Sequence, residues 1–421
     1  MNKIEFIKSL KRVKLVIGNG FDLHCGLHTT YGDYFCRNRK SLEFIRDLYT
    51  SFKRAGTICF NFSERRFSDM NIWDVFFVVN GPGNLAECCK RWCDIENMML
   101  NSFSNKNNTA SDVEELVIRL TSTTNWRDIY YFVTRDIEAK EWEDRFITMF
   151  AKEKMWHLKI YPGDFYTFLL DELKEFEKRF GEFIYYQLHD YYFERINYNS
   201  QQFLNVPYIR KATDTIDLLC NVDNLVGIDS FNYSYIHQEK LMELLQHING
   251  SFKNPIFGID TIFEPNDECF IFTKTARRID SDMLEESFES KPDFDNLIVY
   301  GHSLNKADYS YFFPIFDKLL LTDSLSTKTI VFAYSIFDKD KKEELKAYTR
   351  KAVSDIMFAY AKSKQLPDPG RFLDSLSTQK RIIMYEVPPL DSMNYGSCHI
   401  DEEWDAIYKE NNLLNESEKT K

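Results

Sequence analysis

Short runs of apolar residues constrain the fold of this chain more than any other feature, and several of them end in glycine or small polar residues. The runs are Lys11–Ile17, Leu225–Ile228, Pro255–Asp260, Asn296–Tyr300, Thr329–Tyr334 and Arg381–Tyr385. Continuous apolar strands that alternate with helical stretches are typical of a parallel sheet with helices on both faces. The sequence therefore predicts an α/β fold with a doubly wound, mostly parallel sheet.

The 421 residues of the chain exceed what one ordinary hydrophobic core accommodates. The stretch after the first strand is rich in Trp and Phe and mostly helical in pattern. We therefore expect an α/β core formed by residues 11–56 and 220–390, a large helical insertion at 57–219, and a polar tail at 405–421. Within this plan we expect a loop at Asn101–Asp112, a helical run at Asp164–Phe193 that breaks near Gly181, and a charged helix at Asp340–Lys364.

Composition excludes several classes of protein. The net charge of -12 argues against general binding of nucleic acids. The nine cysteines are odd in number and irregularly spaced, so a secreted disulfide scaffold is not expected, and Cys88, Cys89 and Cys93 are interpreted as buried helix residues rather than metal ligands. No signal peptide or apolar membrane span is present, which predicts a cytoplasmic protein that holds no metal and contacts no membrane.

The segment Gly18-Asn19-Gly20-Phe21-Asp22 follows the first strand and precedes a helix that Thr29 or Thr30 is placed to cap. Glycines permit close approach of the backbone to a ligand, and the amides of such a loop favour an anion such as pyrophosphate. The full G-x-G-x-x-G pattern is absent, because position 23 is leucine. A plain strand-to-helix turn is the alternative interpretation.

Three later segments resemble this one, since each follows an apolar strand with small or polar residues. They are Phe231-Asn232-Tyr233, His247-Ile248-Asn249-Gly250-Ser251 and Gly301-His302-Ser303. In doubly wound folds the ligand lies outside the carboxyl ends of the strands. We therefore expect the four segments to converge on one binding site.

The order of these segments resembles the bacterial AbiH (bacteriophage abortive infection) family. The resemblance rests on Val16–Leu23 with Gly26-Leu27 and Thr29-Thr30-Tyr31, on Phe231–Tyr233, on His247–Ser251 with Ile256–Asp260, and on Tyr300–Leu304 with Asp308. AbiH proteins are in turn similar to SIR2-like (sirtuin-like) domains, which bind NAD. The resemblance implies a SIR2/Rossmann-like fold with NAD as substrate or ligand.

The resemblance also implies roles for particular residues. Gly18, Asn19, Gly20 and Phe21 would form the phosphate loop, and Thr30, Gly301 and Ser303 would contact the nucleotide. Asn232 would orient ribose and water, although a turn Asn at a strand end is the alternative. Asp22 would either contact ribose hydroxyls or simply cap a helix.

The general base is the point at which the chain departs from the SIR2-like pattern. Asn249 stands where those enzymes place a His directly before Gly, and an amide cannot take up a proton near neutral pH. His247 or His302 would then accept the proton, and a structural role is the alternative for either. A Ser303–His302–Asp308 triad is disfavoured, because the sequence lacks a G-x-S-x-G elbow.

Two functions follow from this pattern. The first is an antiphage effector that binds NAD and hydrolyses its nicotinamide–ribose bond. The alternative is a non-catalytic nucleotide-binding sensor or interaction module of a phage-defence system. A phage-derived trigger and a homo-oligomer are the further partners that the resemblance implies. A nuclease is disfavoured, because no carboxylates cluster at two-metal spacing.

Overall fold

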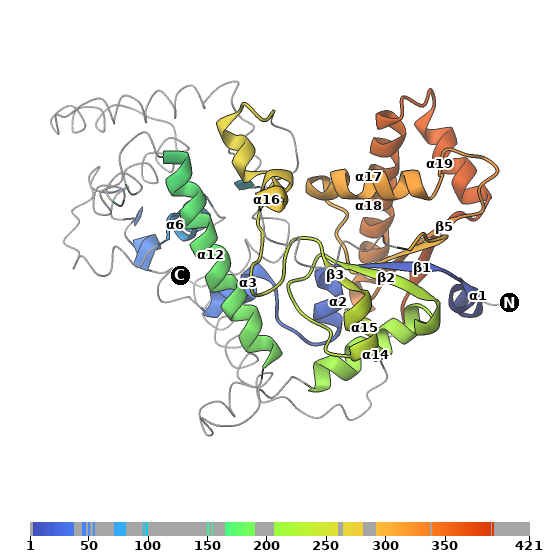
Figure 1. Ribbon diagram of the computed structural model, residues 1–421, viewed down its shortest axis with the longest axis horizontal. Coiled ribbons are helices and arrows are strands. Elements are labelled where there is room, and N and C mark those ends of the chain that lie inside the picture. Colours follow the sequence, from blue (N-terminus) through green and yellow to red (C-terminus); the bar gives the residue numbers. More distant parts are fainter. Residues whose placement is uncertain are drawn as a thin grey trace. The chain divides into compact units, whose positions relative to one another are not determined.

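The computed structural model describes residues 3–37, 44–47, 49–50, 54, 71–80, 96, 98–99, 150, 154, 165–189, 206–259, 264–280, 292–336, 339–388 and 390. Most of the expected insertion, including Asn101–Asp112 and the cysteines at 88, 89 and 93, lies outside these residues, as does the expected tail. The chain forms two compact units (Figure 1). The first comprises Met1–Thr29, Gly181–Pro255 and Asp282–Lys421, and the second comprises Thr30–Phe180 and Ile256–Ser281.

A six-stranded parallel sheet forms the centre of the first unit. Its strands are β1 (Val13–Ile17), β2 (Leu225–Ser230), β3 (Leu245–His247), β4 (Asn296–Tyr300), β5 (Thr329–Tyr334) and β6 (Ile382–Glu386). Their order across the sheet is β3-β2-β1-β4-β5-β6, and every pairing is parallel. The predicted parallel α/β sheet is therefore confirmed, with five of its strands within two or three residues of their expected bounds.

Helices flank this sheet. They are α1 (Lys3–Ser9), α2 (Asn19–His24), α14 (Val206–Leu219), α15 (Glu239–Leu244), α17 (Tyr309–Lys318), α18 (Lys342–Ser363) and α19 (Pro369–Thr378), with short 3₁₀ helices η3 (Val222–Asn224), η6 (Lys306–Asp308) and η7 (Lys339–Lys341). Figure 1 shows α17 and α18 on one side of the sheet and α14 and α15 on the other. The expected charged helix at Asp340–Lys364 is α18.

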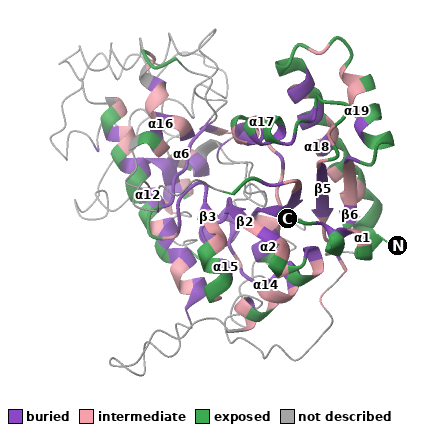
Figure 2. Cartoon of the chain, turned by 45° about the vertical axis from the view of Figure 1, so that its right-hand side comes forward, coloured by how far each residue is buried: buried purple, intermediate pink, exposed green. Residues whose placement is uncertain are grey.

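Alternation along the strands builds the core beneath α17 and α18. Val16, Val299 and Phe332 face the same side of three neighbouring strands and pack with Phe316 of α17 and Met357 of α18. All of them are at most 2% exposed. Figure 2 shows β2 and β5 largely in the colour of buried residues, whereas much of α19 is exposed. Burial on both faces explains why these strands read as continuous apolar runs.

The second unit contains α3 (Tyr31–Arg37), α6 (Ile72–Asn80), η4 (Glu268–Phe272) and α16 (Lys274–Asp280). Its core is aromatic. Rings of Tyr34, Phe35, Phe77, Phe176 and Phe180 lie in edge or tilted contacts with centroids 5.4–6.4 Å apart. Aromatic pairs prefer these arrangements over face-to-face stacking, so the Phe-rich composition here serves packing.

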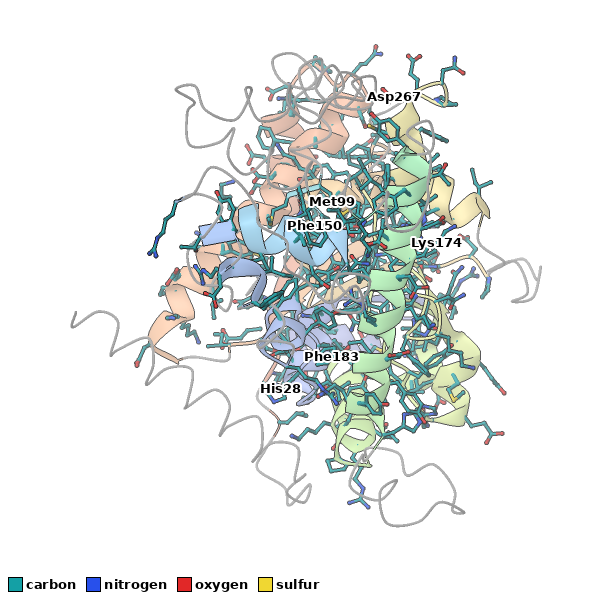
Figure 3. All side chains as sticks on the ribbon, turned by 90° about the vertical axis from the view of Figure 1, so that its left-hand side faces the viewer. His28, Met99, Phe150, Lys174, Phe183 and Asp267 are labelled. Atoms are coloured by element: carbon teal, nitrogen blue, oxygen red, sulfur yellow. The ribbon has the colours of Figure 1, made fainter. Side chains whose placement is uncertain are left out.

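Helix α12 (Phe165–Leu188) corrects the expected break near Gly181, because the helix continues through this residue. Its residues up to Phe180 belong to the second unit and the remainder to the first. A Cβ atom on Gly181 would lie 2.0 Å from the carbonyl oxygen of Phe252, so the glycine serves close approach of a loop rather than a break. Figure 3 labels two residues of this helix, Lys174 and Phe183; Phe183 is 3% exposed, whereas the Lys174 side chain is 57% exposed.

The expected strand at Pro255–Asp260 is also wrong, because its described residues join no sheet. Ile259 makes only an isolated bridge to Thr273, and the amide of Phe257 donates to the Glu177 carboxylate at 2.7 Å. That carboxylate also accepts two hydrogen bonds from Arg277 at 2.7 and 3.0 Å. The apolar run indicates that these residues are buried, not that they pair with a strand. Periodicity alone cannot distinguish a buried segment from a strand in a sheet.

Candidate functional site

The loops that follow β1 and β4 are held together by their backbones. The amide of Gly18 donates to the carbonyl of Tyr300 at 3.0 Å, and the amide of Gly20 donates to Gly301 at 2.8 Å. Gly301 has a φ of +67°, and a Cβ atom on it would lie 2.4 Å from the amide nitrogen of Phe21. The glycines of both loops therefore allow two backbones to touch, a demand that no other residue meets.

The structure corrects the expected phosphate loop, because Asn19–Asp22 begin helix α2 and only Gly18 separates this helix from β1. The amides of Gly18 and Gly20 donate to the loop after β4, and that of Phe21 donates to the Gly18 carbonyl at 2.8 Å. The Asn19 side chain accepts a hydrogen bond from the Thr29 hydroxyl at 2.7 Å. The amides of Gly18, Gly20 and Phe21 thus already donate hydrogen bonds to carbonyls of the protein. An anion bound in this conformation would have to accept hydrogen bonds from other groups.

Asp22 is the centre of a buried polar cluster. Its carboxylate accepts hydrogen bonds from Ser234 at 2.7 and 2.8 Å, from the Tyr208 hydroxyl at 3.1 Å, and from Thr29 at 3.5 Å. Burial raises the pKa of Asp22 to about 7, and hydrogen bonds from Ser234, Tyr208, Asn232 and Thr29 oppose this rise. The carboxyl group therefore changes its charge near neutral pH, which is unusual for an aspartate.

Neither Ser234 nor Tyr208 was expected from the sequence as part of this cluster. Ser234 lies two residues beyond Asn232, so the segment after β2 carried a signal for it. Tyr208 lies in α14, where no motif marks it, and only the packing of α14 brings its hydroxyl to Asp22.

Asn232 lies beyond the end of β2 and is 2% exposed. Its side-chain amide nitrogen donates to the carbonyl of Gly18 at 3.0 Å, and its backbone amide donates to the Ser230 hydroxyl at 3.1 Å. The first bond fixes the orientation of the side chain, because a carbonyl can only accept. The remaining atom, Oδ1, is buried and has no hydrogen-bond partner.

His247 ends the neighbouring strand β3 and is 5% exposed. Its Nδ1 donates to the carbonyl of Asn232 at 2.9 Å, so in the neutral ring Nε2 carries a lone pair. Nε2 is buried without a partner. Burial lowers the pKa of His247 to about 4, against the opposing effect of the bond to Asn232. The imidazole is therefore uncharged at neutral pH.

The segment after His247 leaves the strand at once. Asn249 is 3% exposed and lies beyond the end of β3, so strand alternation does not fix its direction relative to His247. Gly250 has a φ of +79°, and a Cβ atom on it would lie 2.1 Å from the Asn254 carbonyl oxygen. The tight turn explains why glycine follows Asn249.

His302 is held on both ring nitrogens. Nδ1 accepts from the amide of Leu304 at 2.9 Å, and Nε2 lies 3.5 Å from a carboxylate oxygen of Asp308. The ring packs edge-on against Phe231 and Phe312, with centroids 4.3 and 5.1 Å apart. To accept a proton, His302 would have to break the bond from Leu304. Ser303, its partly buried neighbour, lies beside this arrangement rather than in it.

A second short chain of polar groups lies at the same loops and was not expected from the sequence. The Tyr300 hydroxyl contacts both Nδ1 of His24 and the Ser335 hydroxyl, and Ser335 lies 3.2 Å from the same nitrogen. Burial, followed by the charge of Lys211, lowers the pKa of His24. The Nδ1 atom of His24 is therefore engaged by side chains of the protein itself, those of Tyr300 and Ser335.

Thr30 belongs to the second unit, where it caps α3. Its hydroxyl donates to Asp33 at 2.5 Å and accepts from the Asp33 amide at 3.0 Å, a reciprocal capping arrangement. This confirms the expected helix cap. The predicted contact of Thr30 with a nucleotide stays a prediction.

The residues brought together at the carboxyl ends of β1–β4 are named here the strand-end site. They are Gly18–Asp22, Asn232, Ser234, His247, Asn249, Gly301 and His302. Within the described part of the chain, no group of three or more His, Cys, Asp or Glu residues is arranged to hold a metal ion. Nor does any helix in that part combine the length and apolar character needed to cross a membrane.

Comparison with known proteins identifies the family. Residues 15–332 match the family model described as bacteriophage abortive infection AbiH, a range that contains the whole strand-end site. No curated protein and no solved structure shows a significant match to the chain. The chain belongs to the bacteriophage abortive infection AbiH family, and this membership indicates a role in phage abortive infection.

Proposed function

We propose that this protein is an abortive-infection effector that binds NAD or a related nucleotide at the strand-end site and hydrolyses its nicotinamide–ribose bond. The observation that carries the proposal is the pair of unpartnered acceptors, Asn232 Oδ1 and His247 Nε2. Leaving a buried polar group unsatisfied costs about 1–3 kcal/mol. Two such groups at the ends of adjacent strands point to a ligand that donates hydrogen bonds.

The sheet supports the choice of a dinucleotide. Its order, β3-β2-β1-β4-β5-β6, is the order found in dinucleotide-binding folds of the Rossmann type. In such sheets the ligand lies at the carboxyl ends of the strands, where the order reverses, and here that point lies between β1 and β4. Gly18–Asp22 and Gly301 follow these two strands.

The chemistry of hydrolysis matches the groups available. Water adds a hydroxyl to the anomeric carbon of ribose, nicotinamide leaves with the electron pair of the broken bond, and one proton passes to a base. The transition state resembles an oxocarbenium ion, so it requires oriented ribose and a positioned water. Asn232 Oδ1 would orient a ribose hydroxyl or the water, and the lone pair of His247 Nε2 would accept the proton.

Asp22 acts in this proposal as a positioning residue. Its hydrogen bonds to Ser234 and Tyr208 join α2 to the loop after β2 and to α14. That loop carries Asn232. Loss of the carboxylate would therefore release the loop and misplace Asn232 without removing any group that touches substrate.

The test is a turnover assay with the purified full-length chain, in the presence and absence of extract from phage-infected cells. Nicotinamide release from NAD is followed by chromatography. We expect release by the wild type and a loss of about 10²–10³-fold in Asn232→Ala, the loss typical for one transition-state contact. Titration of the extract and sizing of the protein would reveal a phage trigger or self-association.

Asn296→Ala provides a matched control. Asn296 also donates its side-chain amide to a backbone carbonyl, that of Lys11 at 2.7 Å, but it begins β4 and so lies at the opposite end of the sheet. It should retain wild-type turnover. Absence of turnover under every condition, in a protein that still protects cells from phage, would overturn the hydrolase proposal.

The environment of the two candidate general bases, His302 and His247, favours a second function. His302 has its lone pair engaged by Leu304, and His247 has a pKa of about 4, so both are weak proton acceptors in this conformation. This favours a sensor that binds a nucleotide without turning it over. Calorimetry with NAD, ADP-ribose and nucleoside triphosphates tests it, and turnover that is lost in Asn232→Ala would count against it.

A further inference from the structure

Beside the strand-end site lies a cluster of six rings, all in the first unit. They are Tyr185 and His189 of the end of α12, Tyr235 and His237 of the loop after β2, His247 of β3, and Phe252 of the loop after β3. Tyr185 and His189 stack with centroids 4.0 Å apart. Tyr235 contacts three of the others, with centroids 4.6–6.0 Å away. We call this set the ring cluster.

The ring cluster differs from an ordinary aromatic core in its nitrogen atoms. His247 Nε2 and His237 Nε2 are both buried without a hydrogen-bond partner. Nδ1 of His189 donates to the Tyr185 carbonyl at 3.0 Å, which turns its lone pair to the other nitrogen in the neutral ring. A core built only for packing would not leave imidazole nitrogens unpaired, because each costs free energy.

Part of the ring cluster is open to solvent. Tyr185, Tyr235, His237 and Phe252 are each partly exposed, whereas His247 lies beneath them at 5% exposure. Burial lowers the pKa of both His237 and His247, and His189 lowers that of His237 further. The surroundings are thus aromatic, rich in hydrogen-bond acceptors, and unsuited to holding a phosphate.

We propose that the ring cluster binds the planar heteroaromatic ring of the nucleotide, stacked on Tyr235, with an amino or amide N–H of that ring donating to His237 Nε2. The lone pair of His247 Nε2 then stays available for the proton. This inference rests on the proposed function, since it names the part of the ligand that this side of the site takes. The chemistry is shared by the adenine amino group and the nicotinamide carboxamide. Stacking on one aromatic side chain contributes about 1–3 kcal/mol, enough to decide affinity.

The experiment is calorimetry with the full-length chain and three ligands: adenosine monophosphate, nicotinamide mononucleotide and ribose 5-phosphate. Tyr235→Leu removes the stacking face, and His237→Phe keeps a ring but removes the acceptor. For the ligand whose ring is recognised, each variant should lose at least about fivefold in affinity, the lower end expected for one stacked base. Ribose 5-phosphate should bind equally to all variants.

Two further variants keep the result interpretable. Tyr235→Trp retains a stacking face and should bind within about threefold of the wild type, as stacking tolerates a change of ring. Tyr348→Leu, on the exposed surface of α18, should change nothing. Selective loss of adenosine monophosphate assigns adenine, and selective loss of nicotinamide mononucleotide assigns nicotinamide.

Two negative results are distinguishable. If the wild type binds NAD but Tyr235→Leu and His237→Phe bind every ligand as the wild type does, the ring cluster is not the ring site and the proposed function stands. If the wild type binds no nucleotide at all, the proposed function itself fails and the inference fails with it.

Discussion

Two sets of buried polar side chains in the first unit differ in their hydrogen-bond partners. One is Arg381, and the other is the pair Asn232 and His247. Arg381 precedes β6, at the amino end of the sheet. Its guanidinium makes five hydrogen bonds of 2.7–3.5 Å to backbone carbonyls of the loop between α17 and β5. Asn232 and His247, at the carboxyl end, each keep one buried acceptor without a partner.

The difference distinguishes a polar group that holds the fold together from the two groups that are proposed to bind a ligand. At the amino end, each nitrogen of the guanidinium is satisfied by the loop that it holds, so the group has nothing left for a ligand. At the carboxyl end, the Asn232 side-chain amide and the His247 Nδ1–H donate hydrogen bonds that fix the two side chains, and each side chain leaves one acceptor unused. Orientation without saturation is the arrangement expected of a binding site.

The largest expected effect is a loss of stability when the Arg381 guanidinium, at the amino end of the sheet, is removed. Arg381→Met removes five donors from the carbonyls of residues 319–328, so the free energy of unfolding should fall by roughly 3–5 kcal/mol. Denaturation in urea measures this. Arg350→Met, on an exposed face of α18, is the matched control and should change little. A loss below about 1 kcal/mol would mean that water replaces the guanidinium at little cost.

The next effect concerns the contact between the loops after β1 and β4. Gly301→Ala places a Cβ atom against Phe21 and forces a left-handed conformation on alanine, so we expect a loss of about 2–4 kcal/mol. Gly227→Ala in β2 is the control, because its Cβ atom would meet nothing within 4 Å. Equal stability of both variants, again by urea denaturation, would show that the two loops separate readily.

The smallest expected effect is on the pH dependence of stability, and it concerns Asp22 and His247 at the carboxyl end of the sheet. The folded pKa of Asp22 is about 7, above its ordinary 3.8, so between these values the folded state holds a proton that the unfolded state lacks. Its contribution to stability is present at low pH and is lost as pH rises toward 7. His247 has a folded pKa of about 4, below its ordinary 6.5, so its contribution is lost as pH falls from 6.5 toward 4.

Each group contributes a slope of about 1.4 kcal/mol per pH unit, with opposite signs, between about pH 4.5 and 6. The two slopes offset each other in the wild type. In Asp22→Asn, stability should therefore rise with pH relative to the wild type, and in His247→Gln it should fall. Urea denaturation across this range checks the prediction, and parallel profiles for all three proteins would contradict it.

Most of the sheet could be predicted from the sequence because both of its faces are buried. Asn296–Tyr300 and Thr329–Tyr334 are strands with the expected bounds, since a strand covered on both sides must be apolar at every position. Pro255–Asp260 has the same composition but joins no sheet in its described residues. A strand partner is a property of the whole fold, and a short apolar run does not encode it.

The site was less predictable than the sheet. Asp22, Asn232 and His247 lie together as expected from the strand ends, because parallel strands place their carboxyl ends on one edge. Hydrogen bonds to backbone carbonyls decide which atom of Asn232 and of His247 has no partner, and no sequence motif predicts these bonds. The partner of Asp22 on α14, Tyr208, comes from a helix with no marked residue, and only tertiary packing reveals it.

The central place of β1 in the sheet has a consequence for the synthesis of the chain. Val13 pairs with Leu225 on one side and with Asn296 on the other, so its nearer partner follows 212 residues later (225 minus 13). At roughly 5–20 residues per second, a ribosome needs about 10–40 s to make that interval. Throughout this time an apolar strand has no partner from its own sheet. We therefore expect the nascent chain to present an unpaired apolar segment to which chaperones can bind before the sheet forms.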